Sequence, residues 1–175
     1  MKTRLILFVV CLAASGFCKF SGLRGSVFEI RMKNQASGTY PGILQAGVNK
    51  TGVPEPWTEK QLMAPADLAA IINDPNAKKP VILCVGPGAL IMGSLDMGPA
   101  KEKINLEKLK QQLSKLPRET DVVIYCGCCP FDHCPNIRPA FNLLNEMKFS
   151  NAHLLNLEHN IRTDWVAKGY PQAKA

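Results

Sequence analysis

Internal repeats and low-complexity tracts are absent from this chain of 175 residues, which excludes repeat architectures and favours a single domain with its own hydrophobic core. Basic clusters are missing too: the 21 Lys and Arg residues are scattered, and aromatic residues make up only 7% of the sequence. We therefore expect no nucleic-acid partner. The net charge of +7, or +5 without Lys2 and Arg4, predicts a mildly basic, solvated surface that helps gather small anions.

Long apolar runs are also lacking. The run from Leu5 to Ala14 is too short for a comfortable membrane span, so no stable span is expected. It follows the positive residues Lys2 and Arg4 and ends in small residues, a pattern typical of a signal peptide at residues 1–16. We expect an exported protein, periplasmic or secreted. In such an oxidising compartment, cysteines are bridged, metal-bound or kept reduced for a task.

Residues 17–56 form the next segment and carry little regular spacing. Glycine and proline interrupt most of it, which predicts an N-terminal arm made of turns. One edge strand is expected near residues 28–32, where apolar and polar residues alternate. We assign no chemistry to this arm.

Residues 57–173 show strands alternating with helices, as apolar runs alternate with segments of helical spacing. This order predicts an α/β fold with a central, mainly parallel sheet and helices on both faces. The expected strands are 80–85, 122–125 and 153–157, and the expected helices are 65–73, 105–116, 136–147 and 160–168.

The segment DVVIYCGCCPFDHCPNIRPAF, residues 121–141, carries the most reactive side chains. Its apolar run 122–125 is a predicted buried strand that ends at Cys126. A cysteine at the carboxyl end of a parallel strand, before a loop and a helix, lies where α/β folds place reactive groups. Backbone N–H groups and the helix dipole there favour a thiolate or a bound anion.

The loop after this strand leaves several thiol chemistries open. Cys128 and Cys129 are adjacent and would bond to each other only with strain, so Cys129–Cys134 or Cys128–Cys134 are the better disulfide candidates. With Cys126, the same thiols could bind zinc or Cu(I), and the metal, if any, stays unknown. His133 is interpreted as a loop residue.

Several motifs of this half of the chain resemble those of rhodanese-like domains. They are the Cys-headed loop after the strand, the Arg-containing helix start with "FNLLNEMKF", then "HLLNL" and the closing "DWVAKGYP". The upstream pieces "PADLAAII" and "IMGSLDMGPA" are similar as well. The resemblance implies the three-layer rhodanese-like fold for residues 57–173.

The resemblance also implies an activity. A rhodanese-type sulfurtransferase moves sulfane sulfur from a small sulfur-containing anion such as thiosulfate, through a cysteine persulfide, to a thiol or other acceptor, with no cofactor. By position, Cys126 matches the sulfur-accepting cysteine and Arg138 the arginine that binds the oxyanion, while the amides of Gly127, Cys128 and Cys129 match the cradle. Cys134 is a rival nucleophile. The alternative is a non-catalytic redox or soft-metal-binding module on the same scaffold.

Overall fold

The computed structural model describes residues 46–48 and 54–174, which lie in one compact unit. The expected signal peptide 1–16, the edge strand near 28–32 and most of the arm 17–56 lie outside the described residues. Within the described ranges, no helix has the length and apolar character needed to cross a bilayer.

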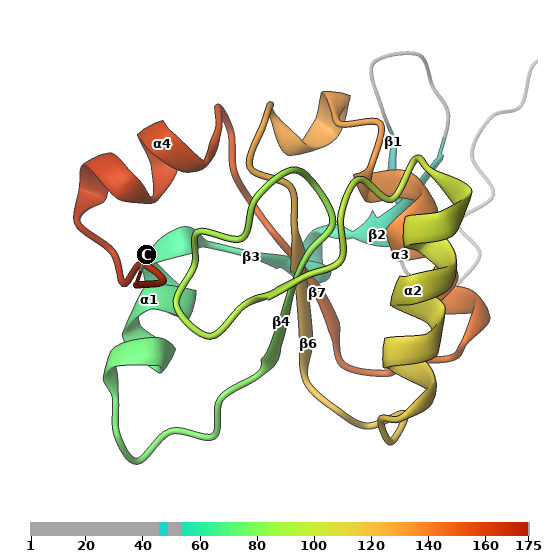
Figure 1. The fold of residues 1–175 in the computed structure, drawn as a ribbon, viewed down its shortest axis with the longest axis horizontal. Coiled ribbons are helices and arrows are strands. Elements are labelled where there is room, and N and C mark those ends of the chain that lie inside the picture. The colour runs from blue at the N-terminus through green and yellow to red at the C-terminus, as the bar shows by residue number, and fades with distance from the viewer. Residues whose placement is uncertain (1–45, 49–53, 175) are drawn as a thin grey trace, which may run out of the picture. The chain divides into compact units, whose positions relative to one another are not determined.

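A five-stranded sheet forms the centre of the unit, with strand order β3-β7-β6-β4-β5 and every pairing parallel (Figure 1). A separate antiparallel pair joins β1 and β2. The strands are β1 Ala46–Val48, β2 Pro54–Thr58, β3 Leu62–Met63, β4 Val81–Cys84, β5 Leu95–Asp96, β6 Val122–Tyr125 and β7 Ala152–Leu155. The helices are α1 Pro65–Asn73, α2 Lys103–Ser114, α3 Ile137–Glu146 and α4 Ile161–Asp164, with 3-10 turns at Glu59–Gln61, Phe131–His133 and Val166–Lys168.

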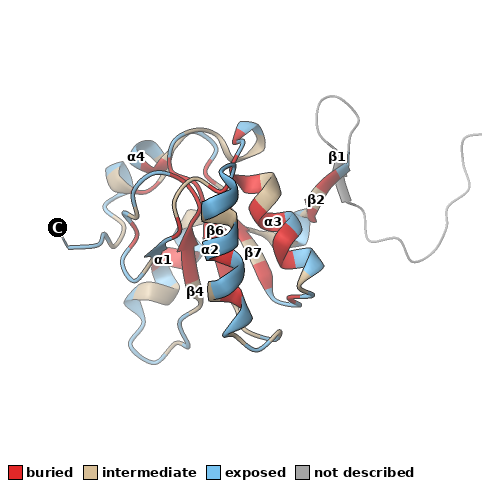
Figure 2. Cartoon of the chain, turned by 45° about the vertical axis from the view of Figure 1, so that its right-hand side comes forward, coloured by how far each residue is buried: buried red, intermediate tan, exposed pale blue. Residues whose placement is uncertain are grey.

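Two hydrophobic cores make the unit three layers thick. Helices α2 and α3 cover one face of the sheet, while α1 and α4 cover the other (Figure 1). Strand β6 supplies both cores, because successive side chains of a strand point to opposite faces. Val122 and Ile124 pack toward α2 and α3, and Val123 and Tyr125 toward α1 and α4. Figure 2 shows the resulting buried centre and the exposed outer face of α2.

The predicted α/β class is confirmed, including the parallel central sheet and the helices on both faces. The expected strand at 122–125 matches β6 to the residue, and Trp165, within the closing "DWVAKGYP" motif, is fully buried. The last helix is shorter than predicted: α4 ends before Trp165, and a 3-10 turn follows. Gly169 then closes this turn with φ 69°, a left-handed conformation that glycine adopts without a steric cost.

The C-terminal part of the expected arm belongs to the folded unit. Glu55 of β2, within the expected arm, is buried. The neighbouring Trp57, the first residue of the expected domain, is buried too, and its ring packs against Phe131 at 6.1 Å and edge-on against Phe141 at 5.7 Å. These aromatic contacts attach β2 to the cysteine loop and to α3.

Candidate functional site

Cys126 follows β6 directly and lies at the carboxyl end of the parallel sheet, as predicted. Cys126 is only 2% exposed. Gly86, which follows β4, lies so close that a Cβ there would overlap the Cys126 Sγ, so only glycine fits this approach. The buried side chain of Asn136, at the start of α3, donates a hydrogen bond from Nδ2 to that sulfur at 3.5 Å.

Four thiols gather around this position. The Cys128 Sγ lies 3.3 Å from that of Cys126 and 3.1 Å from that of Cys129. The sulfurs of Cys126, Cys128 and Cys134 all lie within 4.8 Å of one another. These separations exceed the S–S bond of about 2.05 Å, and the five cysteines of the described ranges are free. The disulfide pairs considered from the sequence therefore stay predictions for the oxidised protein.

Burial differs sharply within this cluster. Cys134 is fully buried and Cys126 nearly so, Cys129 is half-buried, and Cys128 is exposed. A solute from the surrounding solution therefore meets Cys128 before it meets the buried Cys126.

The local environment raises the pKa of two of these thiols, Cys126 and Cys129. A hydrogen bond with the Cys134 thiol, together with burial, raises the pKa of Cys126 well above its usual value. Burial and the bond with Cys128 raise the pKa of Cys129 to about 11. For Cys126 this direction is opposite to the lowered pKa expected from its place before a helix, because the hydrogen bond with Cys134 and burial both disfavour the thiolate.

A cavity of about 360 Å³ opens beside the exposed thiol. Its walls come from loops after three neighbouring strands, β4, β6 and β7, and from the start of α4. Arg162, in the first turn of α4, contributes the one cationic side chain of this wall, and Cys128 contributes the one thiol. The lining residues are Pro87, Leu90, Gly127, Cys128, Asn160, Ile161 and Arg162.

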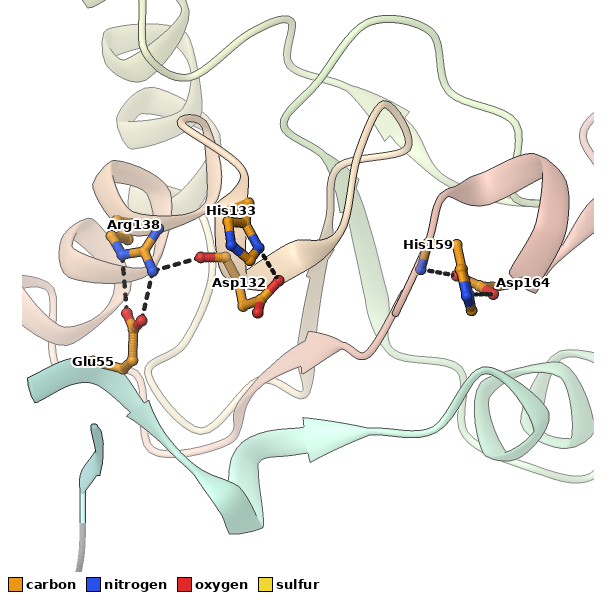
Figure 3. A network of polar contacts seen from close by, with 6 residues as sticks. All are labelled: Glu55, Asp132, His133, Arg138, His159 and Asp164. Atoms are coloured by element: carbon orange, nitrogen blue, oxygen red, sulfur yellow. Dashed lines mark hydrogen bonds and ion pairs between the residues drawn. The ribbon is translucent and has the colours of Figure 1, made fainter. Parts of the chain in front are cut away.

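Arg138, the expected oxyanion-binding residue, is engaged elsewhere (Figure 3). Its Nε and Nη2 donate to the two carboxylate oxygens of Glu55 at 2.9 and 2.5 Å, and Nη2 also donates to the Asp132 carbonyl at 2.7 Å. Its guanidinium lies over the Trp57 ring at 5.6 Å. This fork-to-carboxylate geometry ties β2 to α3 and the cysteine loop, and it uses donors that an incoming anion would need.

The two histidines in Figure 3 each pair with a carboxylate close in sequence, Asp132 for His133 and Asp164, at the end of α4, for His159. His133 Nδ1 lies 2.7 Å from Asp132 Oδ1, and His159 Nδ1 lies 3.1 Å from Asp164 Oδ1. Neither histidine belongs to the group of three sulfurs described above. The interpretation of His133 as a loop residue agrees with this placement.

Three residues of the site were not expected from the sequence: Gly86, Asn136 and Arg162. A signal existed for each, because loops after adjacent parallel strands meet at one edge of the sheet. Gly86 follows the strand beside β6, Asn136 precedes a helix, and Arg162 follows the N-cap residue Asn160, whose Oδ1 accepts from the Arg162 N–H at 2.9 Å.

Comparison with known proteins adds no assignment: no protein-family model matches the chain, and no curated protein matches it either.

Proposed function

We propose that this chain is a sulfurtransferase that carries sulfane sulfur as a cysteine persulfide within residues 126–134. One observation carries the proposal: the exposed Cys128 thiol faces a cavity and lies 3.3 Å from the buried Cys126 thiol, at the carboxyl end of the sheet. This arrangement offers an accessible thiol for the donor and a shielded thiol next to it for the carrier. The resemblance of the surrounding motifs to rhodanese-like domains supports the same reaction class.

Sulfur enters at Cys128 in this proposal. Its thiolate attacks the outer sulfur of thiosulfate, the new S–S bond forms as that of thiosulfate breaks, and sulfite leaves with the electron pair. The Cys126 thiolate then attacks the outer sulfur of the Cys128 persulfide. The Cys126 persulfide forms, Cys128 leaves as a thiolate, and it takes up the proton that Cys126 gave up.

Arg162 takes the anion-binding role in this scheme, in place of Arg138. Arg162 lines the same cavity as Cys128, and the ion pairs of the described residues do not include it. Arg138 keeps its bidentate pair with Glu55. A planar guanidinium suits the sulfonate end of thiosulfate, since two parallel N–H groups can bind two oxygens.

Mass spectrometry of the reduced protein after reaction with thiosulfate tests the proposal. We expect a mass gain of one sulfur atom on the 126–134 peptide, released as thiocyanate when cyanide is added. Cys128→Ser should abolish the gain, and Cys126→Ser should leave it on Cys128. Cys84→Ser is the matched control and should retain the gain, because Cys84 is a buried thiol outside the group. A wild-type protein that gains no sulfur from any sulfane donor would overturn the proposal.

A thiol–disulfide redox module is the second candidate. Cys126 and Cys129 have the Cys-x-x-Cys spacing typical of exchange motifs, and both lie in contact with or next to the exposed Cys128. Oxidation to a disulfide without persulfide formation, in the same mass-spectrometric experiment, would favour this function.

A further inference from the structure

The three sulfurs of Cys126, Cys128 and Cys134 form a triangle that has the size of a metal site. All of them lie within 4.8 Å of one another, and the side between Cys126 and Cys128 is 3.3 Å. Three sulfurs around one cation, each at a metal–sulfur distance of about 2.3 Å, lie about 4.0 Å apart in a trigonal plane. Each sulfur–sulfur separation therefore needs to change by less than about 1 Å to reach this trigonal geometry, and rotation of the cysteine side chains can supply such a change.

The donor set selects the kind of cation. Three sulfurs without a carboxylate or imidazole in the group suit a soft cation and exclude Mg²⁺ and Ca²⁺, which prefer oxygen. Structural zinc sites take four ligands in tetrahedral geometry. The nearest additional thiol, Cys129, contacts Cys128 at 3.1 Å but does not belong to the group of three. A three-sulfur group therefore favours Cu(I) over zinc.

The surroundings of the triangle resemble those of a metal-binding site. Asn136 donates its Nδ2–H to the Cys126 sulfur at 3.5 Å, and its Oδ1 accepts from the Lys101 N–H at 3.1 Å, which holds the amide in this orientation. Such outer contacts orient ligands and tune their affinity. Two of the three thiols, Cys126 and Cys134, are buried, while Cys128 is exposed. The site is therefore shielded from solvent on the side of the two buried ligands, and a cation can enter beside Cys128.

We propose that Cys126, Cys128 and Cys134 bind one Cu(I) ion in trigonal thiolate coordination, with Asn136 as the outer hydrogen-bond donor. Each ligating thiol releases its proton to solvent on binding. No electron is transferred, because the ion is taken up as Cu(I). The site uses the same thiols as sulfur transfer, so a bound ion excludes persulfide formation. The binding itself does not depend on the sulfurtransferase proposal.

Competition with a chromogenic Cu(I) chelator, under anaerobic conditions and with the reduced full chain, tests the site. We expect the protein to withdraw one Cu(I) per chain and X-ray absorption to show only sulfur neighbours. Cys128→Ser is the key variant because this exposed side chain has the least influence on folding. It should weaken binding by more than the 10–100-fold typical of losing an outer-shell partner. Asn136→Ala should fall within that range, and Cys84→Ser should leave binding unchanged.

Other outcomes would overturn the assignment. Unchanged affinity in Cys128→Ser, while thermal melts show each variant folded, would place the ion elsewhere. A requirement for Cys129, together with preference for Zn²⁺ in the same competition format, would replace the trigonal site by a tetrahedral one. Failure of sulfur transfer with intact Cu(I) binding would affect only the proposed function, since the chelator assay needs no turnover.

Discussion

Exposure separates the four loop thiols into different roles, although the residue type is the same. Cys128 is exposed, Cys129 half-buried, and Cys126 and Cys134 buried. A thiol reacts as its thiolate, so a raised pKa and a closed environment both slow its reactions. The chemistry of the loop should therefore begin at Cys128 even though Cys126 occupies the end of the strand.

Alkylation kinetics check this order. At pH 8, iodoacetamide should modify Cys128 first, because it is exposed, and Cys126 far more slowly, because the Cys134 thiol and burial raise its pKa. Cys129, with its pKa raised to about 11, should react more slowly than Cys128. Time-resolved peptide mass spectrometry gives the individual rates. Equal rates for Cys126 and Cys128 would contradict the burial argument.

Strand β6 binds the opposite loop through Tyr125, which is fully buried at the strand's end. Its hydroxyl oxygen accepts from the N–H groups of Leu90 and Ile91 at 3.1 and 3.3 Å and lies 3.0 Å from Ser94 Oγ. These contacts hold the loop after β4, and this loop forms part of the cavity wall. The position of this cavity wall thus depends on Tyr125, a residue that contributes no reacting atom.

Tyr125→Phe should lower the free energy of unfolding by about 1–3 kcal/mol, because the buried Ile91 N–H and the partly buried Leu90 N–H lose their acceptor. Burial also raises the pKa of Tyr125 from 10.0 to about 12. The stability that comes from keeping the phenol neutral is complete below pH 10 and is lost as the pH rises through 12. Urea unfolding between pH 8 and 12 should therefore show a steeper decline in the wild type than in the variant. Parallel declines would contradict this.

The tips of β4 and β6 approach each other through Gly86 and Cys126. Gly86→Ala should destabilise the protein by about 1–3 kcal/mol, because the added methyl group overlaps the Cys126 sulfur. Cys126→Ala removes that sulfur, so the double variant should recover part of the loss, a coupling that a double-mutant cycle of denaturation midpoints measures. Strictly additive effects would show that the clash lies elsewhere.

The Arg138–Glu55 pair connects β2 to α3. The Glu55 side chain is 7% exposed and that of Arg138 34%, so the pair is partly screened by solvent. We expect Glu55→Ala to cost about 1–3 kcal/mol in unfolding free energy, less than a fully buried pair would. Persulfide formation should survive in this variant, while Arg162→Gln should raise the KM for thiosulfate without loss of stability.

The exposed Glu107→Ala on α2 serves as the control for this pair and should change neither quantity. If Glu55→Ala abolishes donor use in a folded protein while Arg162→Gln does not, the anion-binding role returns to Arg138, as the sequence resemblance implied.

At the scale of the whole molecule, the sequence alone was sufficient to predict those strands and helices that a local pattern of residues marks. Continuous apolar runs marked β4 and β6, since a parallel strand is buried on both faces. Helical spacing marked α1, α2 and α3. The two-residue strands β3 and β5 were not expected, because a periodicity cannot show in two residues.

The candidate site, too, was predictable only where local sequence patterns reveal it. Its cysteines were found because they are close in sequence. The partner of Arg138 was not, because Glu55 lies 83 positions away and only the folded chain brings the two together. Nor did the sequence show that Cys126 is buried, since burial depends on Gly86 and α3 closing over it. Contacts between residues distant in sequence, and the burial that results from them, are set by tertiary packing, which a local sequence pattern does not reveal.

The brevity of β3 and β5 also affects how the molecule behaves at high concentration. They are the outermost strands of the five-stranded sheet, and each spans only two residues. An open sheet edge offers unpaired N–H and C=O groups on which a strand from another molecule can assemble, and a short edge limits that growth. The sheet therefore combines a fully paired interior with borders that are poor templates for aggregation.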